Sequence, residues 1–338
     1  KLLDQNREII SRRSGCPVEI IRVLEMDRAR CLALGISPDQ IAGDIGDIIN
    51  HPQIDIVVEL IGGEEPAFSF IMAAMKKGKH IVTANKDLIA VRGKELFDAA
   101  SENNVDFYFE GSVGGGIPVV YPLKQSLAAN NIKTVIGILN GTTNYILTKM
   151  SREGRSFSEV LEKAQELGYA EADPTSDVEG LDAARKIAIL SSIAFNSRIT
   201  LNDVYVEGIT GVTAADIGYA RELGYVIKLL AIAREEAEGR VLVKVHPAFI
   251  SQNHPLAAVN DVFNAVFIKG DAVGDIMLYG RGAGQMPTAS AVVGDIIEIS
   301  RNMIQNITTR IGCTCYDDKQ VMDILHSSSQ FYIRMLVT

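Results

Sequence analysis

The sequence has no tryptophan and only four cysteines, and its five histidines are dispersed. Neither residue type shows the spacing of a metal site, and the single C-x-C at Cys313 and Cys315 is too little for a disulfide framework. These features predict reduced thiols and a cytoplasmic protein. No apolar run approaches the roughly 20 residues of a membrane-spanning helix, and no signal-peptide pattern is present. We therefore expect no contact with a membrane.

Charge argues against a second class of partner. The 42 acidic side chains outnumber the 33 basic ones, which gives a net charge of -9. Such a surface repels polyphosphates, and no basic stretch interleaved with aromatic residues offsets it, so we expect no nucleic-acid partner. Hydrophobic residues make up 47% of the 338 residues, which is enough for a large core, and this length favours two domains with a third started.

The first part of the sequence alternates between strand and helix patterns. Strands are expected at 18–24, 54–61, 80–83 and 105–109, and helices at 1–13, 28–34, 65–77 and 86–102. Strands separated by helices of this length form βαβ units around a parallel sheet that is covered on both faces. The usual hand of the crossover favours a doubly wound, Rossmann-like α/β domain of the kind that binds nucleotides.

The phosphate-binding loop of such a domain is missing from the pattern. A dinucleotide-binding unit normally opens with a strand, a G-x-G-x-x-G loop and a helix whose N-terminus holds the pyrophosphate. The sequence instead begins at Lys1 with a helix pattern. We expect the domain to be truncated at its amino terminus, and the sheet pattern alone leaves open whether it binds a nucleotide.

The pattern changes after residue 131. Ser156 and Glu159 form a capping box, Gly168 ends the helix that follows, and a second helix is expected at 181–195. Strands are expected at 133–139, 203–209, 226–233, 240–250, 262–268 and 275–278, a long helix at 286–305, and a final strand at 331–338. Because strands outnumber helices here, we expect a second domain of the α+β class. A lone strand is unstable, so we expect the chain to end inside a further domain.

Two short segments follow expected strands directly. Gly62 and Gly63 let the backbone approach a ligand closely, although they also suit a tight turn before a helix. Lys86 follows the next strand, where a lysine can reach a bound ligand or simply begin a solvated helix. The residues themselves leave both interpretations open.

The segment 110–118 (EGSVGGGIP) has an unusual run of glycines. Three consecutive glycines can turn carbonyl oxygens inward, and Glu110 adds a carboxylate, so the segment could form an oxygen cage for a hard cation. A flexible turn before a helix that begins near Pro118 fits the same residues.

Acidic residues are densest at 168–186 (GYAEADPTSDVEGLDAARK). Asp182 and Lys186 lie one helical turn apart and so share a face of the expected helix. An exposed ion pair at this spacing contributes roughly a few tenths of a kcal/mol, but the neighbouring residues are aliphatic, so we expect the pair to face a ligand. Oxidation of an alcohol needs a base for the hydroxyl proton. A lysine can serve if burial, or a second cation such as Lys86, lowers its pKa.

Taken together, these segments resemble homoserine dehydrogenase, an NAD(P)-dependent enzyme family that interconverts L-homoserine and L-aspartate 4-semialdehyde in threonine, methionine and isoleucine biosynthesis. The segments NGTTNYI and EADP…GLDAARK are the most specific. The matches lie in family order and are IGGEEPA (61–67), TANKDLIA (83–90), EGSVGGGIPVV (110–120), GILNGTTNYILT (137–148), GYAEADPTSDVEGLDAARK (168–186) and GRGAGQMPTASAVVGD (280–295).

The resemblance implies a role for each matching residue. Lys186 is expected to be the acid/base and Lys86 the second catalytic lysine, while Glu171 and Asp182 bind the amino and hydroxyl ends of the substrate. The residues that match the family's cofactor site are Gly62, Lys86, Gly168 and Gly282. The residues that match its cation site, which usually holds sodium, are Glu110 and the backbone oxygens of Val113, Gly115 and Ile117.

The resemblance also implies a domain organisation. We expect 1–130 with 286–305 to form the nucleotide-binding domain, 131–285 to form the substrate-binding and dimerisation domain, and 306–338 to be a linker with the first strand of an ACT-like regulatory domain. The expected partners are the substrate, a second copy of the chain and a threonine-type effector. In the segment 23–28 (VLEMDR) the acids suit the free ribose of NAD, whereas Arg28 suits the 2′-phosphate of NADP, so both cofactors stay open.

Two other functions were compared with this one. Aspartate-semialdehyde dehydrogenase needs a nucleophilic cysteine at a sheet edge or a helix start, and none of the four cysteines occupies such a position. A non-catalytic amino-acid-binding or sensor relative that lacks the phosphate loop remains the alternative.

Overall fold

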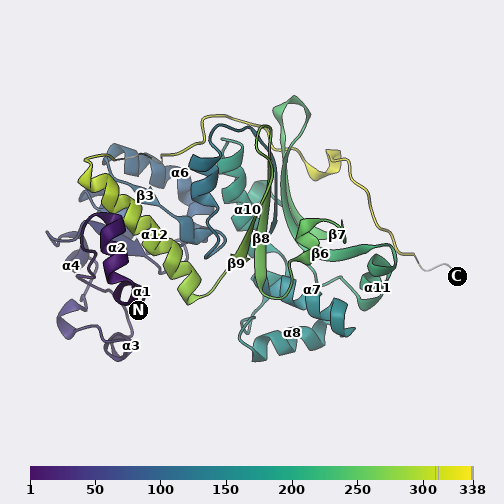
Figure 1. The fold of residues 1–338 in the computed structure, drawn as a ribbon, viewed down its shortest axis with the longest axis horizontal. Helices are drawn as coiled ribbons and strands as arrows, with labels where there is room; N and C mark the ends of the chain where they lie inside the picture. Colours follow the sequence, from purple (N-terminus) through teal and green to yellow (C-terminus); the bar gives the residue numbers. More distant parts are fainter. Residues whose placement is uncertain (309, 311, 336–338) are drawn as a thin grey trace.

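The structure is a computed structural model that describes residues 1–308, 310 and 312–335. The chain forms two parts that lie side by side (Figure 1). One part, which we call the α/β part, surrounds a three-stranded sheet, and the other, the mixed-sheet part, surrounds a six-stranded sheet. No helix of the described residues is long and apolar enough to cross a membrane.

Three parallel strands in the order β1-β2-β3 form the centre of the α/β part. Ile81 of the middle strand packs into the core formed with α5 and α6, whereas Val82 packs against α12 on the other face. Helices therefore cover both faces, which confirms the predicted α/β class with a parallel sheet. The elements are β1 (Ile56–Glu59), β2 (His80–Thr83), β3 (Phe107–Tyr108), α1 (Leu2–Gln5), α2 (Arg7–Ser14), α3 (Arg28–Ala33), α4 (Gly46–Ile49), α5 (Ala67–Lys76), α6 (Lys86–Glu102) and α12 (Gln285–Ile304).

The mixed-sheet part has the strand order β5-β7-β6-β4-β8-β9, in which only the β5–β7 pair is parallel. One face packs against α7 and α10 in the main core, and a smaller apolar cluster around Phe267 and Leu256 lies on the other face. This arrangement confirms the predicted α+β class. The elements are β4 (Ile132–Ile138), β5 (Tyr205–Val206), β6 (Tyr225–Glu235), β7 (Val241–Ser251), β8 (Phe263–Gly270), β9 (Gly274–Arg281), α7 (Gly141–Glu153), α8 (Phe157–Glu166), α9 (Thr175–Val178), α10 (Leu181–Ala194) and α11 (Ala214–Glu222).

Two expected strands are absent from the described residues. The segment 18–24 makes only an isolated bridge from Val23 to Ile41, because its backbone finds a single short partner rather than a sheet edge. Residues 331–335 form no strand, and 336–338 lie outside the described residues. Instead of pairing through its backbone, this segment is held by its side chains, since the ring of Tyr332 stacks on Phe249.

The sequence patterns also missed four helices of the described residues, of which α7 and α11 are the longest and α4 and α9 are single turns. The first turn of α7 contains Gly141, Thr142 and Thr143, which are weak helix formers, and the helix starts because Asn140 caps it. Helix α11 begins with a capping box at Thr213 and contains an internal glycine.

The two parts meet at two places that position the site. Helix α6 packs against α10, and the turn at 113–117 packs against the start of α12. In that turn the Gly116 N–H donates to the Arg281 carbonyl at 3.1 Å. A Cβ on Gly115 would lie 2.6 Å from the Gly282 carbonyl oxygen, so only glycine permits this approach.

Candidate active site

Asp182, in the first turn of α10, is the centre of a buried polar cluster. Its Oδ2 accepts a hydrogen bond from the Lys186 Nζ at 2.6 Å, and its Oδ1 lies 3.4 Å from the Lys86 Nζ. Because Lys86 is the first residue of α6, the two lysines reach one carboxylate from the two parts of the molecule. The structure thus brings together three of the residues that the sequence singled out.

The two lysines keep the carboxyl group of Asp182 ionised. Burial acts to raise the pKa of Asp182, but the ammonium groups of Lys186 and Lys86 and the hydrogen bonds to its oxygens outweigh burial and lower the pKa to about 2. Asp182 is therefore a carboxylate at physiological pH. The Lys186 side chain is only 11% exposed, and it also donates to the Leu139 carbonyl at 2.9 Å.

Asn140 ties a second carboxylate to the cluster. Its Nδ2 donates to Asp182 Oδ2 at 2.9 Å and to Asp177 Oδ1 at 2.7 Å. Its Oδ1 accepts the Thr143 N–H at 2.8 Å, which caps α7. Burial raises the pKa of Asp177, and the nearby Asp182 charge adds to that effect. One buried amide thus holds two acids side by side.

A second ion pair joins the same two helices. Arg185 Nε lies 2.7 Å from Asp87 Oδ1; Asp87 directly follows Lys86 on α6, and Arg185 lies three residues after Asp182 on α10. Two adjacent contacts therefore fix the start of α6 against the start of α10.

Gly62 and Gly63 form a turn at the carboxyl end of β1. Both have positive φ angles, 81° and 70°, and no atom lies within 4 Å of the position that a Cβ would take on either residue. The backbone here is therefore accessible to a ligand at the sheet edge where α/β proteins bind nucleotides.

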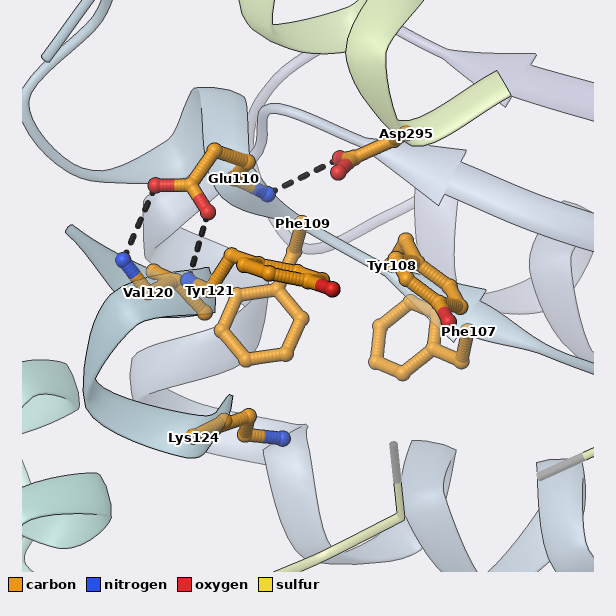
Figure 2. A pocket seen from close by; sticks show the side chains of 8 residues that line it. All are labelled: Phe107, Tyr108, Phe109, Glu110, Val120, Tyr121, Lys124 and Asp295. Carbon is orange, nitrogen blue, oxygen red and sulfur yellow. Dashed lines mark hydrogen bonds between the residues drawn. The ribbon is translucent and has the colours of Figure 1, made fainter. Parts of the chain in front are cut away.

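The carboxylate of Glu110 points to the backbone at Val120 and Tyr121 (Figure 2). Its oxygens accept the N–H groups of Val119, Val120 and Tyr121 at 2.6 to 2.9 Å. Its own N–H donates to Asp295 on α12 at 2.9 Å. Burial, and then the Glu110 charge, raise the pKa of Asp295 well above its usual value.

Three further predicted residues, Glu171, Gly168 and Gly282, make no hydrogen bond or ion pair with this cluster within the part of the chain that the structure describes. Glu171 is exposed in the loop between α8 and α9. Gly168 follows α8 in a left-handed conformation (φ 72°) and is exposed. Gly282 is buried at the end of β9, where a Cβ would lie 2.1 Å from Asn264 Nδ2. No group of three or more His, Cys, Asp or Glu side chains among residues 1–308, 310 and 312–335 could hold a metal ion, so a cation cage in this region would rely on carbonyl oxygens.

The sequence patterns did not assign roles to Asn140, Asp177 and Arg185, although all three lie in segments that carried the resemblance. The N-cap position of Asn140 before a helix was a usable signal. The pairing of Arg185 with Asp87 had no local signal, because the two residues are far apart in the sequence.

Comparisons with known proteins agree over most of the chain. The family profile described as "Homoserine dehydrogenase, NAD binding domain" matches residues 1–110, and the profile "Homoserine dehydrogenase" matches residues 118–297. The homoserine dehydrogenase of Synechocystis sp. is 49% identical over 94% of this chain and 75% of its own length.

Solved structures give the same result. The crystal structure of a homoserine dehydrogenase from Thiobacillus denitrificans has a TM-score of 0.91 and 44% identity, and the match covers 95% of this chain and 75% of that one. A hyperthermophilic archaeal homoserine dehydrogenase in complex with NADPH has a TM-score of 0.74 and 28% identity, and its match covers 90% and 95% of the two chains. With the buried lysine–aspartate cluster intact, these matches show that the chain belongs to the homoserine dehydrogenase family of NAD(P)-dependent oxidoreductases.

Proposed function

We propose that the Asp182 cluster carries out the interconversion of L-homoserine and L-aspartate 4-semialdehyde at the junction of the two parts. The observation that supports this most directly is the sharing of one carboxylate by Lys186 from α10 and Lys86 from α6. The alternative of a non-catalytic sensor is not favoured, since such a protein would have no need of two lysines held on one buried acid.

Lys186 is the proposed acid/base. An ammonium group has three N–H donors, and two of those on Lys186 are used by Asp182 and the Leu139 carbonyl. The third is available to the substrate oxygen. In the reduction direction the ammonium gives this third proton to the aldehyde oxygen and becomes a neutral amine, and in the oxidation direction the neutral amine takes up the hydroxyl proton through its lone pair. Asp182 orients Lys186 and is placed to contact the hydroxyl end of homoserine.

Lys86 and Glu171 have complementary proposed roles. Lys86 is 32% exposed at the start of α6, so its ammonium can face both Asp182 and a cofactor at the sheet edge. Glu171 is exposed in the loop before α9 and is proposed to bind the substrate's amino group. Variants Glu171→Ala and Asp182→Ala should raise the KM for homoserine while the fold is retained.

NAD or NADP is the proposed hydride carrier. When bound, the dinucleotide would supply the acceptor or donor of the hydride for the carbon that bears the hydroxyl or aldehyde oxygen. The open space beside Gly62 fits such a ligand, and Lys86, Gly168 and Gly282 complete the proposed contacts. The archaeal relative was solved with NADPH. In this chain Asp27 and Arg28 both lie at the start of α3, where the acid suits NAD and the arginine suits NADP. Values of kcat/KM with both dinucleotides are therefore the measurement that decides the preference.

A monovalent cation, with sodium as the first choice, is proposed to bind the turn at 113–117. Val113 and Ile117 are buried, and no described residue donates a hydrogen bond to the carbonyl oxygens of Val113, Gly115 or Ile117. These oxygens fit a hard cation. The carboxylate of Glu110 already accepts three N–H groups, so we assign its contribution to the main-chain oxygen. Thorough dialysis should lower activity, and Na⁺ or K⁺ should restore it; activity that ignores both ions would contradict this site.

The remaining proposals concern the whole protein. We propose a cytoplasmic homodimer formed through the mixed-sheet part, which size-exclusion chromatography with light scattering would test. All four cysteines are free in the structure, in keeping with a reducing compartment. Binding of a threonine-type effector stays a prediction.

The experiment that tests the proposed chemistry compares Lys186→Ala with Lys163→Ala. Lys163 makes an exposed ion pair with Glu166 on α8 and serves as the matched control. Loss of a general acid/base costs about 10²- to 10⁴-fold in kcat, so Lys186→Ala should lose activity on this scale while Lys163→Ala stays near wild type. Undiminished turnover in Lys186→Ala would remove the proposed role of Lys186.

A further inference from the structure

Glu59, the last residue of β1, is a buried acid outside the lysine cluster. It is 4% exposed, and both of its carboxylate oxygens accept hydrogen bonds. Oε1 accepts the N–H groups of Ile61 at 2.6 Å and Gly62 at 3.2 Å, and Oε2 accepts the hydroxyl of Thr83 at 2.6 Å. All three donors are neutral, so the acid is held by hydrogen bonds rather than by a cation.

The hydrogen bonds continue from Thr83 to the start of α6. Thr83 Oγ1 accepts the Asn85 N–H at 3.0 Å, and the Asn85 Nδ2 donates to the Gly63 carbonyl at 2.7 Å. Asn85 is also the N-cap of α6, because its Oδ1 accepts the Leu88 N–H at 3.1 Å. The hydrogen bonds therefore form a closed circuit. Glu59 binds the turn at Gly62 and also binds Thr83, Thr83 binds Asn85, and Asn85 returns to the same turn at Gly63.

This circuit joins the two features that the proposed function places beside the cofactor. Gly62 and Gly63 both have positive φ, and a glycine turn that is free at its ends samples many conformations. Glu59 fixes the amide side of the turn, and Asn85 fixes its carbonyl side. The residue after Asn85 is Lys86, so the same hydrogen bonds set where α6 begins.

We propose that Glu59, acting through Thr83 and Asn85, is a positioning residue that locks the Gly62 turn to the start of α6 and so fixes the turn and Lys86 relative to each other. This inference rests on the proposed roles of Gly62 and Lys86. A carboxylate suits the task because it accepts hydrogen bonds at both oxygens. A glutamine would accept at one oxygen only, so its NH2 group would face either the Thr83 hydroxyl or the N–H groups of Ile61 and Gly62 and would remove that set of hydrogen bonds.

Three variants test this inference by steady-state kinetics and thermal unfolding of the full chain. Glu59→Gln and Thr83→Val should each raise the KM for the dinucleotide and lower kcat. In each variant these two changes combined should lower kcat/KM for the dinucleotide by about tenfold. The KM for homoserine should stay within about twofold, since no substrate contact is assigned to this circuit. Thr83→Ser retains the hydroxyl and should restore most of the loss.

Thr148→Val is the matched control. Thr148 is a buried residue of α7 whose hydroxyl donates to the Asn144 carbonyl and accepts the Asp261 N–H. Thr148→Val therefore loses one donated and one accepted hydrogen bond, as Thr83→Val does, but in the mixed-sheet part. It should lower the unfolding temperature without changing the dinucleotide KM. If Glu59→Gln and Thr83→Val also lower only the unfolding temperature, Glu59 is a structural residue and the inference is wrong.

A double-variant cycle separates this inference from the proposed function. If Glu59 acts through Lys86, the kcat of Glu59→Gln combined with Lys86→Ala should equal that of Lys86→Ala alone. Independent, multiplying losses in kcat would overturn the positioning role. Wild-type kinetics in Lys86→Ala itself would instead refute the proposed role of Lys86. Should Glu59→Gln fail to fold, Thr83→Val and Thr83→Ser combined with Lys86→Ala provide the same comparison.

Discussion

The amide of Asn140 serves a helix and a polar cluster at the same time. Its oxygen caps α7 through the Thr143 N–H, and its nitrogen donates to Asp177 and Asp182. Serine caps a helix about as well as asparagine does, but its single hydroxyl cannot bridge the two acids. The two functions of this residue can therefore be separated by substitution.

In Asn140→Ser we expect the unfolding temperature to fall by only a few degrees while kcat falls on the order of tenfold, because the α7 cap is kept but hydrogen bonds to a charged group are lost. Thermal unfolding and steady-state kinetics with homoserine provide the two measurements. Asn140→Asp is the companion variant: it keeps the cap but places a third carboxylate beside Asp177 and Asp182, so it should lose more activity. A normal kcat in Asn140→Ser would show that the amide does not position Asp182.

Asp182 predicts a pH dependence of stability. Its folded-state pKa is lowered from 3.8 to about 2, so its contribution is complete above pH 4 and is lost as the pH falls toward 2. This pH-dependent contribution is about 2 kcal/mol. In urea unfolding, the difference in stability between the wild type and Asp182→Asn should narrow by that amount between pH 4 and pH 2. A difference that is constant over this range would mean that the two lysines do not stabilise the charge.

At the scale of elements, α6 and α10 are joined by the partly exposed pair of Arg185 and Asp87. Such a pair contributes within about 1 kcal/mol to stability, yet it lies next to the Lys86–Asp182 contact. Arg185→Glu should therefore lower kcat/KM several-fold with little change in unfolding temperature, because like charges now separate the helices. The charge-reversed pair, Arg185→Glu with Asp87→Arg, should recover activity; failure to recover would show that helix alignment does not depend on this pair.

Elements with their own local signals were predictable from the sequence. The bounds of β2 and α6 agree with the expected ones, because an apolar strand is followed by an Asn85 cap and a long helical repeat. Helix α7 was missed because its capped first turn is rich in weak helix formers. Glu59 was hidden for a different reason: part of what allows a carboxylate inside an apolar strand to be buried is a hydrogen bond from Thr83 of the next strand. Such contacts depend on tertiary structure and have no local sequence signal.

At the scale of the whole molecule, the proposed site is divided between two parts that each hold one ligand. In the proposed function the dinucleotide binds to the α/β part with Lys86 and homoserine binds to the mixed-sheet part with Lys186. Asp182 contacts both lysines. A bound dinucleotide that holds Lys86 against Asp182 should therefore favour the arrangement that binds homoserine.

Binding of the two ligands should accordingly be coupled. NADPH and homoserine are both reduced, so they form an unreactive pair whose affinities can be measured by calorimetry. Saturating NADPH should lower the Kd for homoserine by about fivefold, and homoserine should lower the Kd for NADPH by the same factor, since coupling of binding is reciprocal. Lys86→Ala removes the Lys86–Asp182 contact and should bring this change in Kd close to onefold. Equal homoserine affinities with and without NADPH in the unsubstituted protein would mean that the two parts bind their ligands independently, with the Lys86–Asp182 contact contributing to catalysis alone.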